Sequence, residues 1–117
     1  MEISQIDFQQ LRIKHLLYKS KVRSMLYGGA FDASFFSVTG PVQMWFDTVG
    51  KVKYADVPEI TALAKLHSEL DIATLALYRL YNDGNLEQAH DGFRNIETRS
   101  DEFLELLTNL DNRLLKV

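Results

Sequence analysis

The chain has 117 residues, of which 46% are hydrophobic and 25% are charged, a balance typical of one compact globular domain with its own core. The net charge is −3, and acidic and basic residues are interspersed, so the composition predicts no binding to nucleic acid or to an anionic membrane surface. The absence of cysteine excludes disulfides, thiolate metal ligands and thiol redox chemistry.

The first predicted element is a helix over about residues 5–27. Residues suited to a buried face recur in it every three or four positions, the spacing of one side of an α-helix: Phe8, Leu11, His15, Tyr18, Val22 and Met25. We expect Ile6, Ile13 and Leu17 to widen this inward face, as a bundle helix requires. Ser4 resembles an N-cap, and the pair Gly28-Gly29 predicts the end of the helix.

The middle of the chain predicts a short helix between two connections. Residues 30–39 form a connection that is unusually apolar, and we expect its phenylalanines to cover one end of a bundle. Pro41 favours the first turn of a short helix, which Gly50 is expected to end, with two aromatic residues as buried anchors. Residues 51–55 are predicted to be the second connection.

The next stretch predicts a long helix that ends at residue 81 or 82. Asp56, Pro58 and Glu59 are interpreted as an N-cap, an early proline and a capping-box glutamate. The positions expected to face inward follow a helical period: Ile60, Leu63, His67, Leu70, Asp71, Thr74, Leu77, Tyr78 and Tyr81.

A last helix is predicted to run essentially to the C-terminus. The sequence Asn82-Asp83-Gly84 indicates a turn before it, and Asn85 with Gln88 is expected to cap it. Its inward positions alternate by threes and fours: Leu86, Ala89, Phe93, Ile96, Ser100, Phe103, Leu107, Leu110 and Leu114. The whole pattern predicts an all-α fold, an antiparallel four-helix bundle with a short additional helix and loop region at about residues 39–50.

Targeting signals are not evident in the sequence. No apolar run approaches the roughly 20 residues that a membrane-spanning helix needs, which predicts no membrane insertion. The first residues, MEISQID, lack the basic and apolar regions of a signal peptide. Met1 and the uninterrupted last helix suit a standalone protein, so we expect residues 1–117 to form a single cytoplasmic domain.

Motifs of common enzyme chemistry are absent from the sequence. It contains no phosphate-binding glycine motif, nucleophile elbow or catalytic triad. Glu87 and His90 match one half-motif of di-iron bundles, but such sites need two copies and further inward carboxylates, so His90 is expected to be a partly exposed helix residue. We therefore predict no catalytic residue.

The aromatic residues are expected in the core: Tyr18, Phe35, Phe36, Trp45, Phe46, Tyr54, Tyr78, Tyr81, Phe93 and Phe103.

Two histidines and one carboxylate lie on faces that the periodicity predicts to be buried. His15 is on the first helix, and His67 and Asp71 are four residues apart on the third, one turn above each other. Buried polar groups are costly unless they are satisfied. Two histidines and a carboxylate are a ligand set for zinc or ferrous iron, with other positions left to water. The residues alone leave open the alternative of hydrogen-bonded core side chains.

Three segments carry a resemblance to a known family: HLLY (residues 15–18), GPVQMW (40–45) and HSELD (67–71). They resemble the His-x-x-aromatic, Cys-x-apolar-Gly-x-aromatic and His-x-x-x-His elements of the chemoreceptor zinc-binding (CZB) domain, at similar spacings. The resemblance covers nearly the whole chain. It implies a bacterial four-helix bundle, often dimeric, that tunes chemoreceptors, diguanylate cyclases and similar signalling outputs.

The resemblance also implies a metal site, with departures from the family. The family holds zinc with three histidines and one cysteine. Carried over by position, His15 and His67 match ligands, Asp71 replaces the second histidine of the third element, and Gly40 stands where the cysteine belongs. Gln43 replaces the glycine of the second element. Because aspartate is a competent zinc ligand, the set would be an open site with water in the remaining position.

We therefore expect a sensory or regulatory domain that binds zinc or a similar divalent metal through His15, His67 and Asp71. A second copy of the chain, or a signalling protein, is the expected partner. One alternative is a metal-free interaction or dimerisation module of the same fold, in which Asp71 holds a histidine by a hydrogen bond and the pair responds to pH. A small metalloenzyme is a further alternative, based only on the open coordination position.

Overall fold

The computed structural model describes residues 3–37 and 40–115 of the chain. Every regular element in these residues is a helix and none is a strand, which confirms the predicted all-α class. The elements are α1 (Ile3–Leu26), α2 (Pro41–Trp45), the π-helical turn η1 (Phe46–Gly50), α3 (Lys51–Lys53), α4 (Pro58–Asn82) and α5 (Leu86–Leu115).

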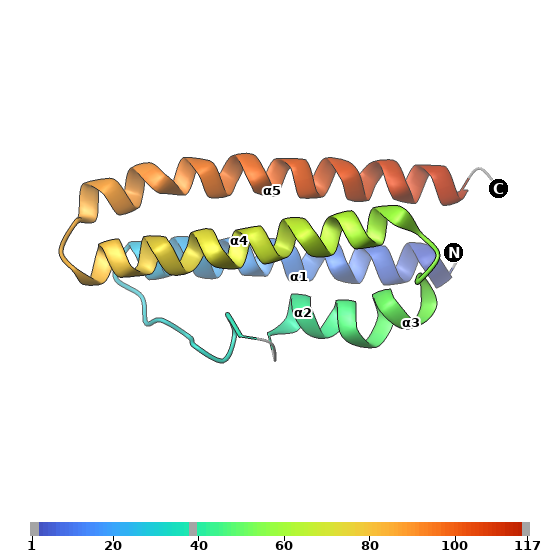
Figure 1. Cartoon of the computed structure of the whole chain (residues 1–117), viewed down its shortest axis with the longest axis horizontal. Coiled ribbons are helices and arrows are strands. Elements are labelled where there is room, and N and C mark those ends of the chain that lie inside the picture. Colours follow the sequence, from blue (N-terminus) through green and yellow to red (C-terminus); the bar gives the residue numbers. More distant parts are fainter. Residues whose placement is uncertain (1–2, 38–39, 116–117) are drawn as a thin grey trace.

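The helices pack lengthwise into a rod of 51 × 24 × 21 Å. The long helices α1, α4 and α5 lie side by side, and the short run from α2 to α3 lies along α4 for part of its length (Figure 1). α5 contacts both α4 and α1. Among the described residues, no helix combines the length and apolar character needed to cross a membrane.

Both ends of α1 show how local sequence sets a helix boundary. Ser4 lies within α1, so the predicted cap at this residue is wrong. The predicted stop is confirmed, because α1 ends at Leu26 and Gly28 adopts a φ of +101°. The N–H of Gly29 then donates to the carbonyl of Ser24 at 2.8 Å, a hydrogen bond that satisfies the last turn of the helix.

The short helical region extends further than predicted. Residues 51–53 are helical, so the connection expected from residue 51 is wrong at its start. The predicted stop at Gly50 is also wrong, because this glycine is buried inside the run. A Cβ atom at Gly50 would lie 3.0 Å from the Trp45 ring and 3.3 Å from Ile60. The glycine therefore serves close packing of η1 on α4 rather than helix termination.

The start of α4 differs from the predicted capping box, although its position at Pro58 and its end at Asn82 agree with the prediction. Val57 occupies the cap position, and no side chain caps it. Glu59 instead accepts two hydrogen bonds from Arg113 of α5, at 2.6 and 2.8 Å. The predicted turn after α4 is confirmed, with Gly84 at a φ of +87°.

The core lies between α1, α4, α5 and the α2–η1 segment, and most predicted inward positions are buried. The buried hydrophobic residues include Phe8, Leu11, Val22, Trp45, Phe46, Leu63, Leu70, Ile96, Phe103 and Leu107. The aromatic residues predicted for the core are buried or packed against it. Leu86, predicted to face inward, is an exception with 47% of its surface exposed.

The predicted widening of the inward face of α1 is wrong. Ile6, Ile13 and Leu17 are exposed by 42%, 66% and 47%. Successive residues turn by about 100° around an α-helix, so Ile13 points away from both Leu11 and His15, which are buried. In the described part of the chain, α1 has neighbours on one side only, and its opposite side is exposed.

The phenylalanines of the connection after α1 pack on the bundle, but along its side as far as Tyr18 rather than over one end as predicted. Phe36 is buried, and its ring meets the Tyr18 ring edge-on at 5.3 Å. The ring of Phe31 stacks on Tyr78 of α4 at 4.1 Å. The last two residues of the predicted connection, 38 and 39, lie outside the described residues.

Candidate functional site

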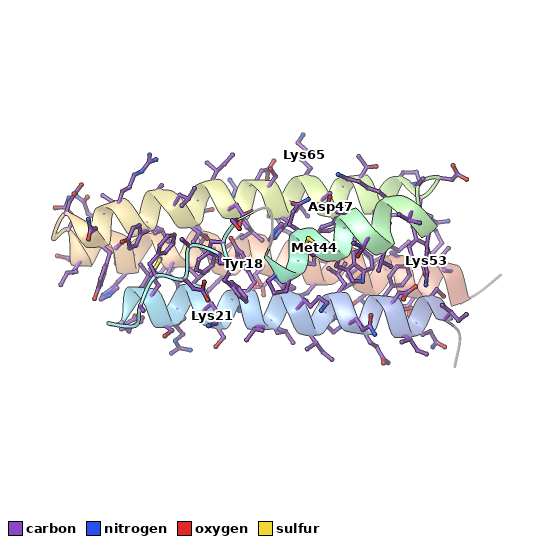
Figure 2. The ribbon with its side chains drawn as sticks, turned by 90° about the horizontal axis from the view of Figure 1, so that it is seen from below. Tyr18, Lys21, Met44, Asp47, Lys53 and Lys65 are labelled. Atoms are coloured by element: carbon purple, nitrogen blue, oxygen red, sulfur yellow. The ribbon has the colours of Figure 1, made fainter. Side chains whose placement is uncertain are left out.

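A group of buried or partly buried polar side chains lies in the middle of the bundle, where α1, α4 and α5 meet. We call it the polar centre, and it comprises His15 and Tyr18 of α1, His67, Asp71 and Thr74 of α4, and Ser100 of α5. Figure 2 shows Tyr18 in the interior, between α1 and α4. The helical period that buries the apolar residues of each helix also turns these polar residues inward.

His15 is fully buried and has one polar contact. Its Nε2 lies 2.7 Å from Oγ of Ser100, and its ring stacks on Phe103 with 4.2 Å between ring centroids. Its Nδ1 has no hydrogen-bond partner. Burial lowers the pKa of His15 to about 4, and the basic side chains of His67, Lys19 and Arg12 nearby act in the same direction. His15 is therefore a neutral imidazole at pH 7.

His67 has the same pattern of one engaged and one free nitrogen. Its Nε2 faces Oδ2 of Asp71 at 3.4 Å, while its Nδ1 has no partner. Burial lowers the pKa of His67, and the Asp71 carboxylate opposes this effect in part. A neutral imidazole carries one N–H, and a carboxylate can only accept, so the proton belongs on Nε2 and the lone pair on Nδ1.

Asp71 is held by α1 as well as by its own helix. Its Oδ1 accepts a hydrogen bond of 2.5 Å from the hydroxyl of Tyr18, whose oxygen also lies 3.2 Å from Oγ1 of Thr74. Burial raises the pKa of Asp71, whereas the nearby His67 and the Tyr18 hydrogen bond lower it. Burial and the Asp71 carboxylate raise the pKa of Tyr18 far above its usual value, so the hydroxyl stays protonated and remains a donor.

The predicted site residues lie in the same part of the core, but they do not form a closed ligand set. The ring of Tyr18 stands edge-on to His67 at 5.0 Å and thus joins the His67–Asp71 pair to α1. His15 instead faces α5 through Ser100. Among the described residues, no three His, Cys, Asp or Glu side chains are grouped closely enough to hold a metal ion.

Sequence reasoning missed the polar roles of Tyr18 and Ser100. Ser100 was predicted only as an inward-facing position, and Tyr18 as an inward-facing core aromatic residue and the aromatic residue of the first family element. The spacing of three between His15 and Tyr18 places the two on one face of α1, a signal for a shared site. Nothing in the sequence pairs Ser100 with His15, because that contact depends on how α1 and α5 are rotated against each other.

Gly40, at the position of the family's cysteine, has no room for a side chain. It is buried, and its N–H donates to the carbonyl of Ser37 at 2.9 Å. A Cβ atom at Gly40 would lie only 2.0 Å from the carbonyl oxygen of Phe35. The backbone of the preceding connection thus fills the space into which a ligand side chain would project.

His90, the third histidine of the chain, lies outside the polar centre. It is partly exposed, as predicted; its Nε2–H donates to the carbonyl of Leu26 at 2.5 Å, and its ring stacks on Tyr27 at 4.4 Å. These contacts fasten the turn after α1 to α5. His90 has a structural explanation and provides a natural control for the other two histidines.

Two side chains of the polar centre, His15 and His67, have the donor atoms that a zinc-like ion prefers. His15 and His67 each have Nε2 beside a protein oxygen and Nδ1 buried without a partner. In metal sites, a ligating histidine usually donates its other N–H to a carboxylate or similar acceptor, which fixes the free lone pair toward the metal. An unsatisfied buried nitrogen costs about 1–3 kcal/mol, and a ligand bound to either Nδ1 atom would remove that cost.

Comparisons with protein-family models, with curated proteins and with solved structures found no match to this chain.

Proposed function

We propose that the chain is a bacterial sensory or regulatory domain of the CZB type, which binds zinc or a similar divalent ion through His15 and His67. The observation that supports this most strongly is the pair of buried imidazoles from different helices, each with Nδ1 lacking a partner. The resemblance in residues 15–18, 40–45 and 67–71 supports the same assignment. The proposal places the domain in the cytoplasm and assigns it no catalytic residue.

The proposed architecture is the antiparallel four-helix bundle, with the α2–α3 run as its short helix. α4 and α5 lie side by side and are joined by a turn of three residues, as adjacent antiparallel helices require (Figure 1). In this arrangement an ion between His15 and His67 would link α1 to α4. Metal binding would then change how firmly the two helices are held together, which gives a means of signalling to an attached or docked partner.

We assign Asp71 a role that differs from direct ligation. Asp71 faces Nε2 of His67, the arrangement by which a carboxylate orients a metal-binding histidine. Direct ligation by Asp71, as the sequence predicts, would use a carboxylate lone pair other than the one that accepts from Tyr18. The variant Asp71→Asn distinguishes the two roles, because loss of an orienting carboxylate typically weakens metal binding about 10- to 100-fold without abolishing it.

Thermal unfolding with and without zinc tests the proposal. An ion that binds the native state at about 100 times its Kd stabilises that state by about 2.7 kcal/mol, which raises the Tm by several degrees. We expect this rise in the parent protein and in His90→Ala, and none in His15→Ala or His67→Ala. A parent Tm that is identical with zinc and with chelator would contradict metal binding.

A metal-free interaction module of the same fold is the second candidate. It is favoured by Gly40, whose surroundings leave no space for a fourth ligand, and by Asp71, which is already hydrogen-bonded to Tyr18. In that case the polar centre would be a hydrogen-bonded part of the core. Function would then reside on the surface, in contacts with a second copy or with a signalling protein.

A further inference from the structure

The outward side of α1 is unusually apolar for a surface that no other element covers within residues 3–37 and 40–115. The exposed hydrophobic residues of α1 are Ile3, Ile6, Ile13, Leu16 and Leu17, followed just beyond the helix by Tyr27, and their exposed fractions range from 42% to 68%. Figure 2 shows α1, in blue, along one edge of the molecule with side chains projecting away from the bundle. Large exposed apolar stretches of this kind mark interaction sites.

The spacing on this side of α1 is that of a helix–helix seam. Positions four and three residues apart form a line that ends at Tyr27, and we call this line the α1 seam: Ile6, Gln10, Ile13, Leu17, Ser20, Ser24 and Tyr27. This is the alternation by which one helix of a coiled coil meets another. No charged residue occupies the seam, so a second helix could bury it without burying a charge.

Basic residues line both edges of the seam. By the helical period, Arg12, Lys19 and Arg23 fall on one edge, and Lys14 and Lys21 fall on the other. α1 contains five basic residues and one acidic residue, a formal charge of +4 in a chain whose net charge is −3. Charge averaged over the whole chain conceals this concentration.

These basic edges have few acidic partners within the molecule. Among the described residues, Lys21 is the one side chain of the five that lies within 4.0 Å of a carboxylate, that of Asp32 at 3.8 Å. The single acidic residue of α1, Asp7, is buried on the opposite side, where it accepts hydrogen bonds from Tyr54 and Lys53. The edges of the seam are therefore available to acidic groups from outside.

The surface beside the seam is hollowed at two places, one between α1 and α5 and one over α1 and the turn that follows it. One shallow hollow of about 240 Å³ is lined by Leu16, Lys19, Ser20, Arg23, Phe93 and Glu97. A second, of about 400 Å³, continues past Ser20 and Arg23 to Tyr27. Hollows of this size next to an exposed apolar row give side chains of a docked helix places to insert.

Charge decides which helix can dock here. A second copy placed seam against seam would bring basic edges together in either orientation, and like charges at these positions are destabilising. α5 of a second copy is acidic, but it lacks an exposed apolar row, because Leu86 is the only large hydrophobic residue exposed among the described residues of α5. A helix with its own apolar row and acidic residues along both edges matches both the shape and the charge of the α1 seam.

We propose that the α1 seam docks an amphipathic helix of a partner protein, one with an apolar heptad row flanked by glutamate or aspartate. This inference does not depend on metal binding at the polar centre, because the seam lies on the opposite side of α1. The signalling partner expected from the sequence therefore has a defined chemistry at its docking segment.

Two synthetic peptides test the proposal. Each is about three heptads long, with isoleucine and leucine in the seam positions; one has glutamate and the other lysine at the flanking positions. We expect the full chain to bind the labelled glutamate peptide in fluorescence anisotropy, more weakly at high salt, and to leave the lysine peptide unbound. The double variant Ile13→Ser, Leu17→Ser should weaken binding by at least about tenfold.

Ile72→Ser is the matched control, since Ile72 of α4 is exposed by 69%, close to the 66% of Ile13, and lies away from the seam. It should leave peptide binding unchanged, with circular dichroism confirming that each variant is folded. Equal binding of both peptides, or of neither, would overturn the proposal. Two further results would overturn it if the double variant abolished them: self-association of the chain and binding to phosphatidylglycerol vesicles. The first would assign the seam to a second copy, and the second would assign it to a membrane surface.

The same titrations with zinc and with chelator separate this proposal from that for the polar centre. We expect the affinity for the glutamate peptide to persist in His15→Ala and His67→Ala. If peptide binding fails while zinc raises the Tm, the docking proposal alone is wrong. If zinc has no effect while the peptide binds, the metal proposal alone is wrong.

Discussion

Tyr18 shows at the level of single residues how an inward polar group is stabilised. Its hydroxyl donates to Asp71 and lies within hydrogen-bond distance of Thr74, so one oxygen links α1 to two successive turns of α4. Tyr18→Phe keeps the ring and removes this link, which leaves a partly buried oxygen of Asp71 and the buried hydroxyl of Thr74 less satisfied. We expect a loss of about 1–3 kcal/mol in the free energy of unfolding, measured by urea denaturation.

Tyr27→Phe is the control for this change. Tyr27 is an exposed tyrosine whose ring stacks on His90, a contact that phenylalanine preserves. The free energy of unfolding of the Tyr27→Phe variant should stay within about 0.5 kcal/mol of the parent value. If Tyr18→Phe were equally harmless, the Tyr18–Asp71 hydrogen bond would not stabilise the polar centre.

The buried histidines make stability depend on pH. The pKa of His15 is about 4 in the folded state and 6.5 in the unfolded state, so the unfolded chain binds the extra proton between these values. Its contribution is fully present above pH 6.5 and is lost as the pH falls toward 4. We expect the free energy of unfolding to decrease by about 2 kcal/mol at pH 5, and by about 3 kcal/mol once His15 is protonated in the folded state as well.

The neighbours of His15 modify this pH dependence in known directions. The pKa of His67 is also lowered, so His67 too makes the free energy of unfolding decrease as the pH falls. The pKa of Asp71 is raised, so protonation of Asp71 opposes this decrease in the pH range where Asp71 titrates. Urea denaturation of the chelator-treated protein at pH 7.5 and pH 5 measures the sum. His15→Gln should flatten the difference, and an unchanged difference in that variant would contradict the assignment to His15.

At the scale of elements, hydrophobic spacing predicted the long helices because each has a continuous inward row. It was wrong at Ile6, Ile13 and Leu17, since a pattern of apolar residues does not reveal which side of α1 has neighbours. The capping residues were also misleading at Glu59, where a cross-bundle contact with Arg113 replaces the predicted capping box. Local sequence contains neither piece of information, because both depend on how helices are placed in space.

The candidate site was predictable to a similar extent. Burial of His15 and His67 followed from their positions in the inward rows and is confirmed. The contacts that orient them were not predictable, because Ser100 and Tyr18 reach their partners across helix interfaces. Sequence spacing thus identified the residues of the centre, whereas the rotation of each helix determines which nitrogen stays free.

The junction before α2 provides a test at the scale of elements. Because a Cβ atom at Gly40 would lie 2.0 Å from the backbone oxygen of Phe35, Gly40→Ala must displace the connection. We expect a loss of about 1–3 kcal/mol in the free energy of unfolding. A Cβ atom at Gly92 meets only the flexible end of Leu77, so Gly92→Ala should cost less, and an equal loss in both variants would contradict the packing of this connection.

For the molecule as a whole, the two proposals use opposite sides of one helix. The inward side of α1 supplies His15 and Tyr18 to the polar centre, and its outward side supplies the α1 seam. A change in how α1 packs on α4 would therefore alter the position of a docked partner helix. Under the two proposals, this shared helix is the element through which the polar centre would act on a docked partner.

Metal content tests the central claim most directly. We would purify the protein without chelator or nickel resin, offer zinc, dialyse, and measure metal by elemental analysis in the parent, His15→Ala, His67→Ala and His90→Ala. The account predicts about one ion per chain in the parent and in His90→Ala, and loss of the ion in the other two variants. A folded parent protein that retains no metal would contradict the account and leave the polar centre as a hydrogen-bonded core.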